Sequence, residues 1–221
     1  MRQLPLNLGH RPALGADDFL VAAPNQEAVA WLDRWPGWPA PALVLEGPAG
    51  SGKTHLAHVF AARAGATLLA AAALEVARLP ELLGAARAAA LDDAEAAEEQ
   101  AFLHLYNMLA ERSGHLLVLA RRPPARWGIR LADLRSRLLA APVAHLLPPD
   151  DALLSAVLVK LFADRQLQVG EDVVAYLLAR LERSFEAAQR AVAALDRAAL
   201  AAQRRITVPL AREVLGERGE G

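Results

Sequence analysis

The chain has 221 residues and a mass of 23.6 kDa, with 54% hydrophobic residues and a formal net charge of −1 at pH 7. This size predicts one substantial domain, or one with a small appendage, and the near-zero charge gives no bulk electrostatic drive toward nucleic acid. Cysteine is absent, which excludes disulfides, thiolate metal sites and cysteine nucleophiles. No apolar stretch is long enough to cross a bilayer and no secretory signal pattern is present, so we expect a cytoplasmic protein without membrane contact.

Strand-like and helix-like patterns alternate through the first two thirds of the sequence. Residues 1–20 carry prolines and glycines without a sustained period, which predicts an extended arm. Asn25 is placed to cap a helix that runs to Trp35. Short apolar runs then indicate buried strands at 42–46, 66–71, 88–91, 115–119 and 143–147. Helical patterns fill the intervals at 52–60, 74–83, 98–111 and 131–139. This alternation predicts an α/β fold, with a parallel five-stranded sheet covered by helices on both faces.

The pattern changes at Pro148, after which no long strand is expected. Helices are predicted at 151–162, 171–181 and 184–203, and a last one ends near 215. We therefore expect three parts: an N-terminal arm at 1–20, an α/β subdomain at 21–148 and a small all-helical lid at 149–221.

The strongest motif is a glycine-rich loop between the first expected strand and the helix that follows it. Its residues fit the pattern G-x-x-x-x-G-K-T: Gly47, Pro48, Ala49, Gly50, Ser51, Gly52, Lys53 and Thr54. Such a loop turns backbone N–H groups toward phosphates, and the helix N-terminus adds positive charge. Lys53 is suited to reach the terminal phosphates and Thr54 to ligate Mg²⁺. His55 follows directly and is expected to line the nucleotide site.

A phosphate-binding loop of this kind needs an acid on a neighbouring strand to orient its metal. Asp92 and Asp93 end the strand at 88–91, about 40 residues after the loop. Asp92 is predicted to hold Mg²⁺ and Asp93 to orient the attacking water, while a helix cap is the alternative for Asp92. The acidic run of Glu95, Glu98 and Glu99 is expected to form the N-terminal turn of the next helix, where it favours the helix dipole.

With these motifs and the segment 100–107, the sequence resembles the AAA+ domain of the replication initiator DnaA. The resemblance is closer to the Hda family of short DnaA homologues. Further matching segments are 18–21, 122–124, 133–138, 195–198 and 201–209. The resemblance implies an AAA+ P-loop NTPase fold and a bound adenine nucleotide, ADP or ATP, with Mg²⁺.

Two features favour Hda over DnaA. No helix-turn-helix module follows the lid, so direct sequence-specific DNA binding is not expected. The N-terminal arm also resembles the motif with which Hda binds the sliding clamp of DNA polymerase III, through Gln3, Leu4, Leu6 and Leu8. An ordinary frayed terminus is the alternative for this arm.

The resemblance to Hda implies regulation of replication initiation. A nucleotide-bound protein on the clamp would meet ATP-bound DnaA and promote its hydrolysis. Arg137 matches the arginine finger of the family, which acts in trans on the nucleotide of the partner. A structural ion pair is the alternative for Arg137.

Two positions depart from the DnaA pattern. The fourth strand ends in Leu119-Ala120-Arg121, which offers no hydroxyl for sensing a γ-phosphate. Glu186 falls where a second sensor arginine is expected, with Arg183 and Arg190 about one turn to either side. We therefore expect a nucleotide, ADP above all, that acts as a conformational ligand, and a weak intrinsic ATPase.

Other functions stay open at this point. They are a nucleotide-dependent AAA+ loader or scaffold, a degenerate AAA+ tether that no longer stimulates hydrolysis, and a small-molecule kinase, although no acceptor pocket is recognisable. A homo-oligomer is compatible with the family. The sequence also leaves open whether a weak basic patch of Arg121, Arg204 and Arg205 faces DNA or protein.

Overall fold

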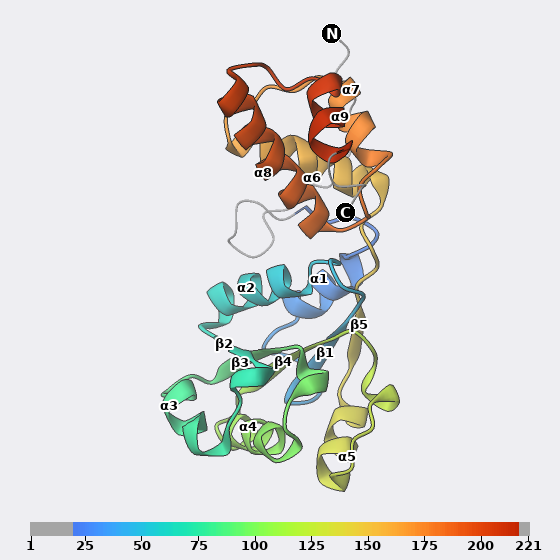
Figure 1. Ribbon diagram of the computed structural model, residues 1–221. Coiled ribbons are helices and arrows are strands. Elements are labelled where there is room, and N and C mark those ends of the chain that lie inside the picture. The colour runs from blue at the N-terminus through green and yellow to red at the C-terminus, as the bar shows by residue number, and fades with distance from the viewer. Residues whose placement is uncertain (1–19, 217–221) are drawn as a thin grey trace. The chain divides into compact units, whose positions relative to one another are not determined.

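The computed structural model describes residues 20–216, which form two compact units with their boundary between Leu147 and Pro148 (Figure 1). The candidate clamp-binding residues Gln3, Leu4, Leu6 and Leu8 lie outside the described residues.

The first unit is built on a five-stranded parallel sheet with the strand order β2-β3-β4-β1-β5. The strands are β1 (Ala42–Glu46), β2 (Thr67–Ala70), β3 (Ala88–Asp92), β4 (His115–Ala120) and β5 (Val143–His145). The predicted sheet is confirmed. Strand β5 is shorter than expected, although Leu146 still donates its backbone N–H to Glu46 at 2.7 Å.

Helices cover both faces of this sheet (Figure 1). On one face lie α1 (Gln26–Asp33) and α2 (Lys53–Ala64), and on the other lie α3 (Leu79–Leu83), α4 (Glu99–Glu111) and α5 (Ala132–Ala140). Short 3₁₀ turns connect them at Ala71–Ala73, Val76–Arg78, Ala94–Ala96 and Pro124–Arg126. The single helix expected at 74–83 is thus a 3₁₀ turn followed by the short α3.

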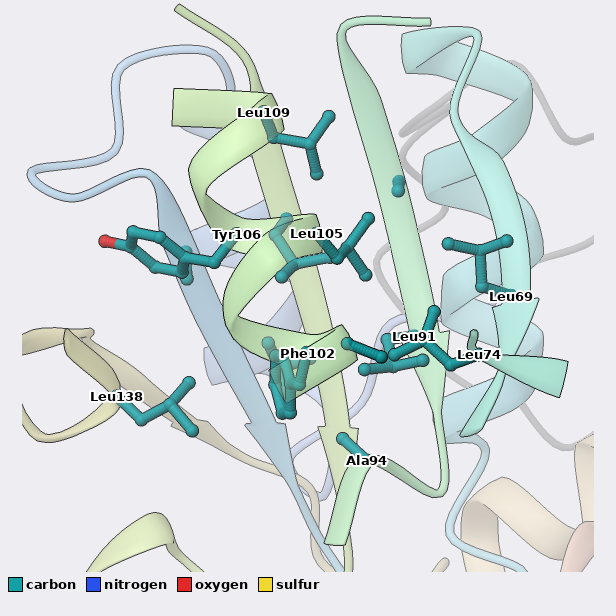
Figure 2. Close-up of a cluster of buried hydrophobic side chains, with 14 of the residues drawn as sticks. Leu69, Leu74, Leu91, Ala94, Phe102, Leu105, Tyr106, Leu109 and Leu138 are labelled. Carbon is teal, nitrogen blue, oxygen red and sulfur yellow. The ribbon is translucent and has the colours of Figure 1, made fainter. Parts of the chain in front are cut away.

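Alternate residues of the strands feed two separate cores. Leu43, Leu45 and Leu117 point toward α1 and α2, whereas Val44 and Val118 point toward α4. Figure 2 shows this second core, in which α4 presents one apolar stripe to the sheet. The labelled residues of that stripe are Phe102, Leu105, Tyr106 and Leu109.

Strand β3 forms from Ala88-Ala89-Ala90-Leu91, although alanine has a low strand propensity. All four residues are at most 2% exposed. Ala88 and Ala90 pack against the core beneath α2, and Ala89 packs against the core beneath α4. Burial on both faces therefore overrides the weak local preference.

The expected cap of the first helix is wrong in its detail. Asn25 precedes α1, but its side chain does not bond to the helix N-terminus. Its Oδ1 accepts the backbone N–H of Ala22 at 2.8 Å and its Nδ2 donates to the carbonyl of Leu20 at 2.9 Å. Asn25 thus closes the turn before α1. The helix ends at Asp33, so Trp35 lies beyond it, where its ring meets the edge of Phe60.

The second unit, called the lid, is all helical in its described part. It contains α6 (Asp151–Asp164), α7 (Glu171–Leu178), α8 (Phe185–Ala202) and α9 (Val208–Gly216). Asp150 caps α6 through a 2.8 Å bond from the N–H of Leu153, and Ser184 caps α8 through a 3.1 Å bond from Ala187. Across residues 20–216, no helix has both the length and the apolar character needed to span a membrane.

Candidate nucleotide-binding site

The glycine-rich loop 47–54 joins the carboxyl end of β1 to the start of α2. Gly47 donates its N–H to the carbonyl of Ala120 in β4 at 3.1 Å. A Cβ on Gly47 would lie 2.5 Å from the carbonyl oxygen of Leu146, so only glycine fits there. Gly52 has a φ of 98° at the N-cap of α2, a conformation that L side chains avoid. The loop is therefore held close to the sheet by its glycines.

The side chain of Lys53 folds back over the start of the glycine-rich loop. Its Nζ donates to the carbonyl oxygens of Gly47 at 2.7 Å and Pro48 at 2.8 Å. Burial of the amine lowers the pKa of Lys53, and the charge of Asp92 opposes this effect. The positive charge of Arg121 lowers it further. The ammonium group thus lies over the glycine-rich loop, bonded to two of its carbonyl oxygens.

Thr54 and Asp92 meet across the helix-sheet boundary. The hydroxyl Oγ1 of Thr54 donates to Oδ2 of Asp92 at 2.8 Å, although the residues are 38 positions apart. The other oxygen, Oδ1, accepts the N–H of Asp93 at 2.9 Å. Hydroxyl and carboxylate oxygens are hard donors that suit Mg²⁺, which commonly keeps several of its waters. The donor set therefore fits that ion, and no larger cluster of metal-ligating side chains occurs in the described part of the chain.

Asp93 and His55 are both exposed at this edge of the sheet. Asp93 has a φ of 51°, in the left-handed region. Its Oδ1 lies 3.8 Å from Nη2 of Arg121. His55 lies in the first turn of α2, next to Thr54. The structure thus brings Asp93 to the same edge as Asp92.

The expectation for Glu95 is wrong. It lies in the 3₁₀ turn before α4, not in the helix, and its carboxylate holds the loop after β4. Oε1 accepts the backbone N–H groups of Arg121 at 2.6 Å and Arg122 at 2.7 Å, and Oε2 lies 2.9 Å from Nη2 of Arg122. Burial acts to raise the pKa of Glu95, but these hydrogen bonds outweigh it and hold the pKa below 4.5. Glu95 therefore fixes the loop that borders the site.

Glu98 and Glu99 have separate roles. Glu98 is the N-cap of α4 and accepts the N–H groups of Gln100 at 2.9 Å and Ala101 at 2.7 Å. Glu99 lies in the first turn, but it accepts backbone N–H groups of the loop before α5, from Arg130 at 3.0 Å and Leu131 at 2.6 Å. Those bonds, from Arg130 first, lower the pKa of Glu99. Glu98 and Glu99 therefore both lie at the N-terminal turn that the sequence predicted, and Glu99 also holds the loop before α5.

Comparison with known proteins gives a family match for the lid and a fold match for the whole chain. Residues 151–215 match the family model described as the lid domain of Hda. Domain III of the DnaA protein of Thermotoga maritima superimposes with a TM-score of 0.77 at 17% identity, over 92% of this chain and 95% of that one. The lid therefore matches that of Hda, and the fold of the whole chain is that of DnaA domain III. The predicted AAA+ fold with its helical lid is confirmed.

Other solved structures share the fold at similarly low sequence identity. The AMPPCP-bound DnaA of Aquifex aeolicus has a TM-score of 0.65 at 17% identity, and the match covers 79% of this chain and 62% of that one. A RuvB variant of Thermotoga maritima has a TM-score of 0.71 at 15% identity, with 88% and 68% covered.

Arg137 lies away from the loop 47–54. It is part of α5, which leads into the amino end of β5, whereas the loop follows the carboxyl end of β1. Its guanidinium donates to Asp133 from Nε at 2.9 Å and from Nη2 at 3.2 Å. The same group lies 5.2 Å from the ring centroid of Tyr106. Hydrogen bonding to Asp133 is the main reason that the pKa of Arg137 is raised. About a third of its side chain, 35%, stays exposed.

The Hda-type lid carries the residues expected near a second sensor. Glu186 and Arg190 form an ion pair one turn apart on α8. Arg183 pairs with Asp151 at the start of α6, at 3.1 Å. The negative charge of Glu186 is therefore balanced within the lid itself. Arg204 lies 3.8 Å from Glu213.

Proposed function

We propose that this protein is a DnaA-related regulator of replication initiation that binds an adenine nucleotide and promotes hydrolysis of ATP bound to DnaA. The observation that carries the proposal is the pairing of Thr54 with Asp92 beside Lys53, in a chain whose lid matches that of Hda. An alternative is a nucleotide-dependent loader or scaffold, or a tether that no longer stimulates hydrolysis.

The chain's own groups account for nucleotide binding. Backbone N–H groups of residues 47–54 and the N-terminus of α2 would hold the phosphates, and Lys53 would turn from its carbonyl partners to the terminal phosphate. Thr54 and Asp92 would hold Mg²⁺, with Asp92 acting through water. Mg²⁺ held by these residues would supply positive charge against the phosphates. Asp93 would orient a water, and His55 would line the site.

A bound nucleotide would act mainly as a conformational ligand. Ala120 ends β4 without a side-chain hydroxyl, and Glu186 is paired with Arg190 inside the lid. These features support a weak intrinsic ATPase and a preference for ADP. Brisk steady-state hydrolysis by the isolated protein would contradict this part of the proposal.

Arg137 would act on the nucleotide of DnaA and not on its own. A guanidinium inserted in trans neutralises charge that develops on the γ-phosphoryl group. The pair with Asp133 is partly exposed on the surface of α5 and is worth little, so exchange for a phosphate is inexpensive. The ring of Tyr106 holds the guanidinium at the surface without burying it.

The remaining parts of the proposal rest on the resemblance to Hda. Gln3, Leu4, Leu6 and Leu8 would bind the sliding clamp through an amide hydrogen bond and an apolar cleft. The protein would act in the cytoplasm. A homo-oligomer is compatible with a site that a neighbouring subunit completes.

The decisive experiment is a reconstituted hydrolysis assay with clamp, DNA and ATP-bound DnaA. Wild-type protein should accelerate hydrolysis, and Arg137→Ala should lose that effect while it keeps its fold and nucleotide affinity. Arg78→Ala is the matched control, because Arg78 is an exposed arginine on the same side of the sheet. Stimulation that survives Arg137→Ala would rule out the finger assignment. A wild-type protein that binds the clamp but never stimulates would favour the tether.

Clamp binding has its own test. Replacement of both Gln3 and Leu6 by alanine should abolish binding to the isolated clamp and leave nucleotide affinity unchanged. Unchanged clamp affinity would show that the arm is not the clamp-binding element.

A further inference from the structure

The lid contains a groove that the function proposed above does not use. The groove lies between the connection from α6 to α7, residues 165–170, and the connection from α8 to α9, residues 203–207. Its volume is about 770 Å³, which is ample for several side chains of a ligand. Every described residue that lines it belongs to the second unit, so the groove is complete within the lid.

The floor of this groove is apolar. Ala199 and Ile206 are buried members of the lid core, and the half-buried Leu167 packs against that core. Leu200 also lines the groove, and 78% of it is exposed. Removal of such apolar surface from water is favourable. The groove is therefore suited to a ligand that brings at least one apolar side chain.

Two exposed arginines, Arg204 and Arg205, stand beside this apolar floor. Arg204 lies 3.8 Å from Glu213, and both side chains of that pair are mostly exposed, so the pair contributes little. Arg205 has no ion-pair partner within residues 20–216. Asp196 is the only acid among the described residues that line the groove, and Arg165 lies 3.8 Å from it. The groove thus offers positive charge that the lid itself does not balance.

Groups that can pair with a peptide backbone also line the groove. Gln166, Gln168 and Gln203 are exposed, and each amide can both donate and accept a hydrogen bond. Among the described residues, the backbone N–H groups of Gln168 and Arg205 find no hydrogen-bond partner. An extended peptide offers both donors and acceptors to such groups, whereas a nucleic acid offers chiefly phosphates and does not need an apolar floor. The lining therefore favours a peptide.

We propose that this groove of the lid is a docking site for an extended acidic peptide segment of a partner protein. An apolar side chain of the segment covers the floor beside Leu200, and its carboxylates bind Arg204 and Arg205. Burial of the apolar side chain supplies affinity, and the charges supply specificity. Docking does not require a nucleotide in the loop 47–54, so the inference goes beyond the proposed function and does not depend on it.

The test is fluorescence anisotropy of a labelled synthetic peptide, Asp-Glu-Leu-Glu-Leu-Asp-Glu, titrated with the full chain. Arg205→Glu should weaken binding by about tenfold or more, because it replaces a charge-assisted bond with repulsion. Leu200→Ser removes apolar surface from the groove and should weaken binding by about threefold or more. Arg197→Ala is the matched control, since Arg197 is an exposed arginine of α8 that does not line the groove, and it should change affinity by less than about twofold. A peptide with lysine in place of every acid should not bind.

Several outcomes would overturn the proposal. They are no binding of the acidic peptide, equal binding of the lysine peptide, and losses in Arg205→Glu that Arg197→Ala matches. A labelled single-stranded oligonucleotide that binds more tightly than the peptide and loses affinity in Arg205→Glu would assign the groove to nucleic acid instead. Self-association of the chain in sedimentation that Arg205→Glu abolishes would assign it to a second copy. Nucleotide affinity should be equal in wild type and Arg205→Glu, which keeps this result separate from a failure of the proposed function.

Discussion

Replacement of Glu95 by alanine should destabilise the first unit strongly, although Glu95 lies in a short surface turn. The carboxylate is 18% exposed and accepts from two backbone N–H groups and from the Arg122 side chain. Each hydrogen bond to a charged group contributes about 1.5–3 kcal/mol. The ion pair with Arg122, whose side chain is largely exposed, adds under about 1 kcal/mol. Water will reach part of the vacated space. We therefore expect a loss of about 2–4 kcal/mol in the free energy of unfolding.

Tryptophan fluorescence during urea or thermal unfolding measures this loss directly. All four tryptophans precede Pro148, so their signal reports on the first unit. Trp127 also donates from Nε1 to the carbonyl of Arg122 at 2.7 Å, within the loop that Glu95 holds. For a unit of this size the midpoint temperature should fall by about 5–15 °C. Glu95→Gln keeps an acceptor for the backbone N–H groups and should lose about half as much.

The pH dependence supplies a second check. Because the pKa of Glu95 is below 4.5 in the folded protein, its contribution is complete above that pH. The contribution is lost as the pH falls through the folded-state pKa. The difference in stability between wild type and Glu95→Ala should therefore narrow in acid. Glu111→Ala, at an exposed position, should stay within about 0.5 kcal/mol of wild type. Equal stability of Glu95→Ala and Glu111→Ala would refute the reasoning.

Three further changes test other parts of the molecule. Asp92→Asn keeps the size of the side chain but removes its charge, so nucleotide affinity should fall about tenfold with Mg²⁺ present and little without it; a loss that ignores Mg²⁺ in a titration would contradict the metal role. Phe102→Ala, at 1% exposure, should cost about 3–5 kcal/mol in chemical denaturation, and a loss below about 1 kcal/mol would show that the site collapses freely. Ser184→Ala removes the cap of α8 and should cost the lid about 1 kcal/mol by circular dichroism, with tryptophan fluorescence unchanged.

Local patterns predict the sheet well because each strand is a short apolar run between turns. Even β3, with three alanines, is recognisable from its position in the alternation and from the acid that ends it. Helix ends are less predictable. Asn25 has the residue type of a cap, yet its side chain closes the preceding turn, because Leu20 and Ala22 lie within its reach. Residue type alone does not distinguish these two uses.

The residues of the candidate nucleotide site are also visible in the sequence, because the glycine-rich motif is contiguous. The supports of the site are not. Glu95 bonds to groups 26 and 27 positions away, and Glu99 to groups 31 and 32 positions away. No local period links such residues. The expectation of a shared helix turn was reasonable for Glu98 and wrong for Glu95, because a fold-dependent partner competes with the helix dipole.

The alanines of β3 have a consequence for how this site tolerates change. Ala88, Ala89 and Ala90 have only methyl side chains, so the strand that ends in Asp92 occupies little space between the helices on its two faces. A valine at any of these positions would push the strand and the neighbouring helices apart, and close-packed interiors transmit such displacements. Such a displacement would reach Asp92 at the end of the strand and change its 2.8 Å contact with Thr54. Substitutions that look conservative in β3 should therefore weaken the Mg²⁺-dependent part of the nucleotide binding proposed above.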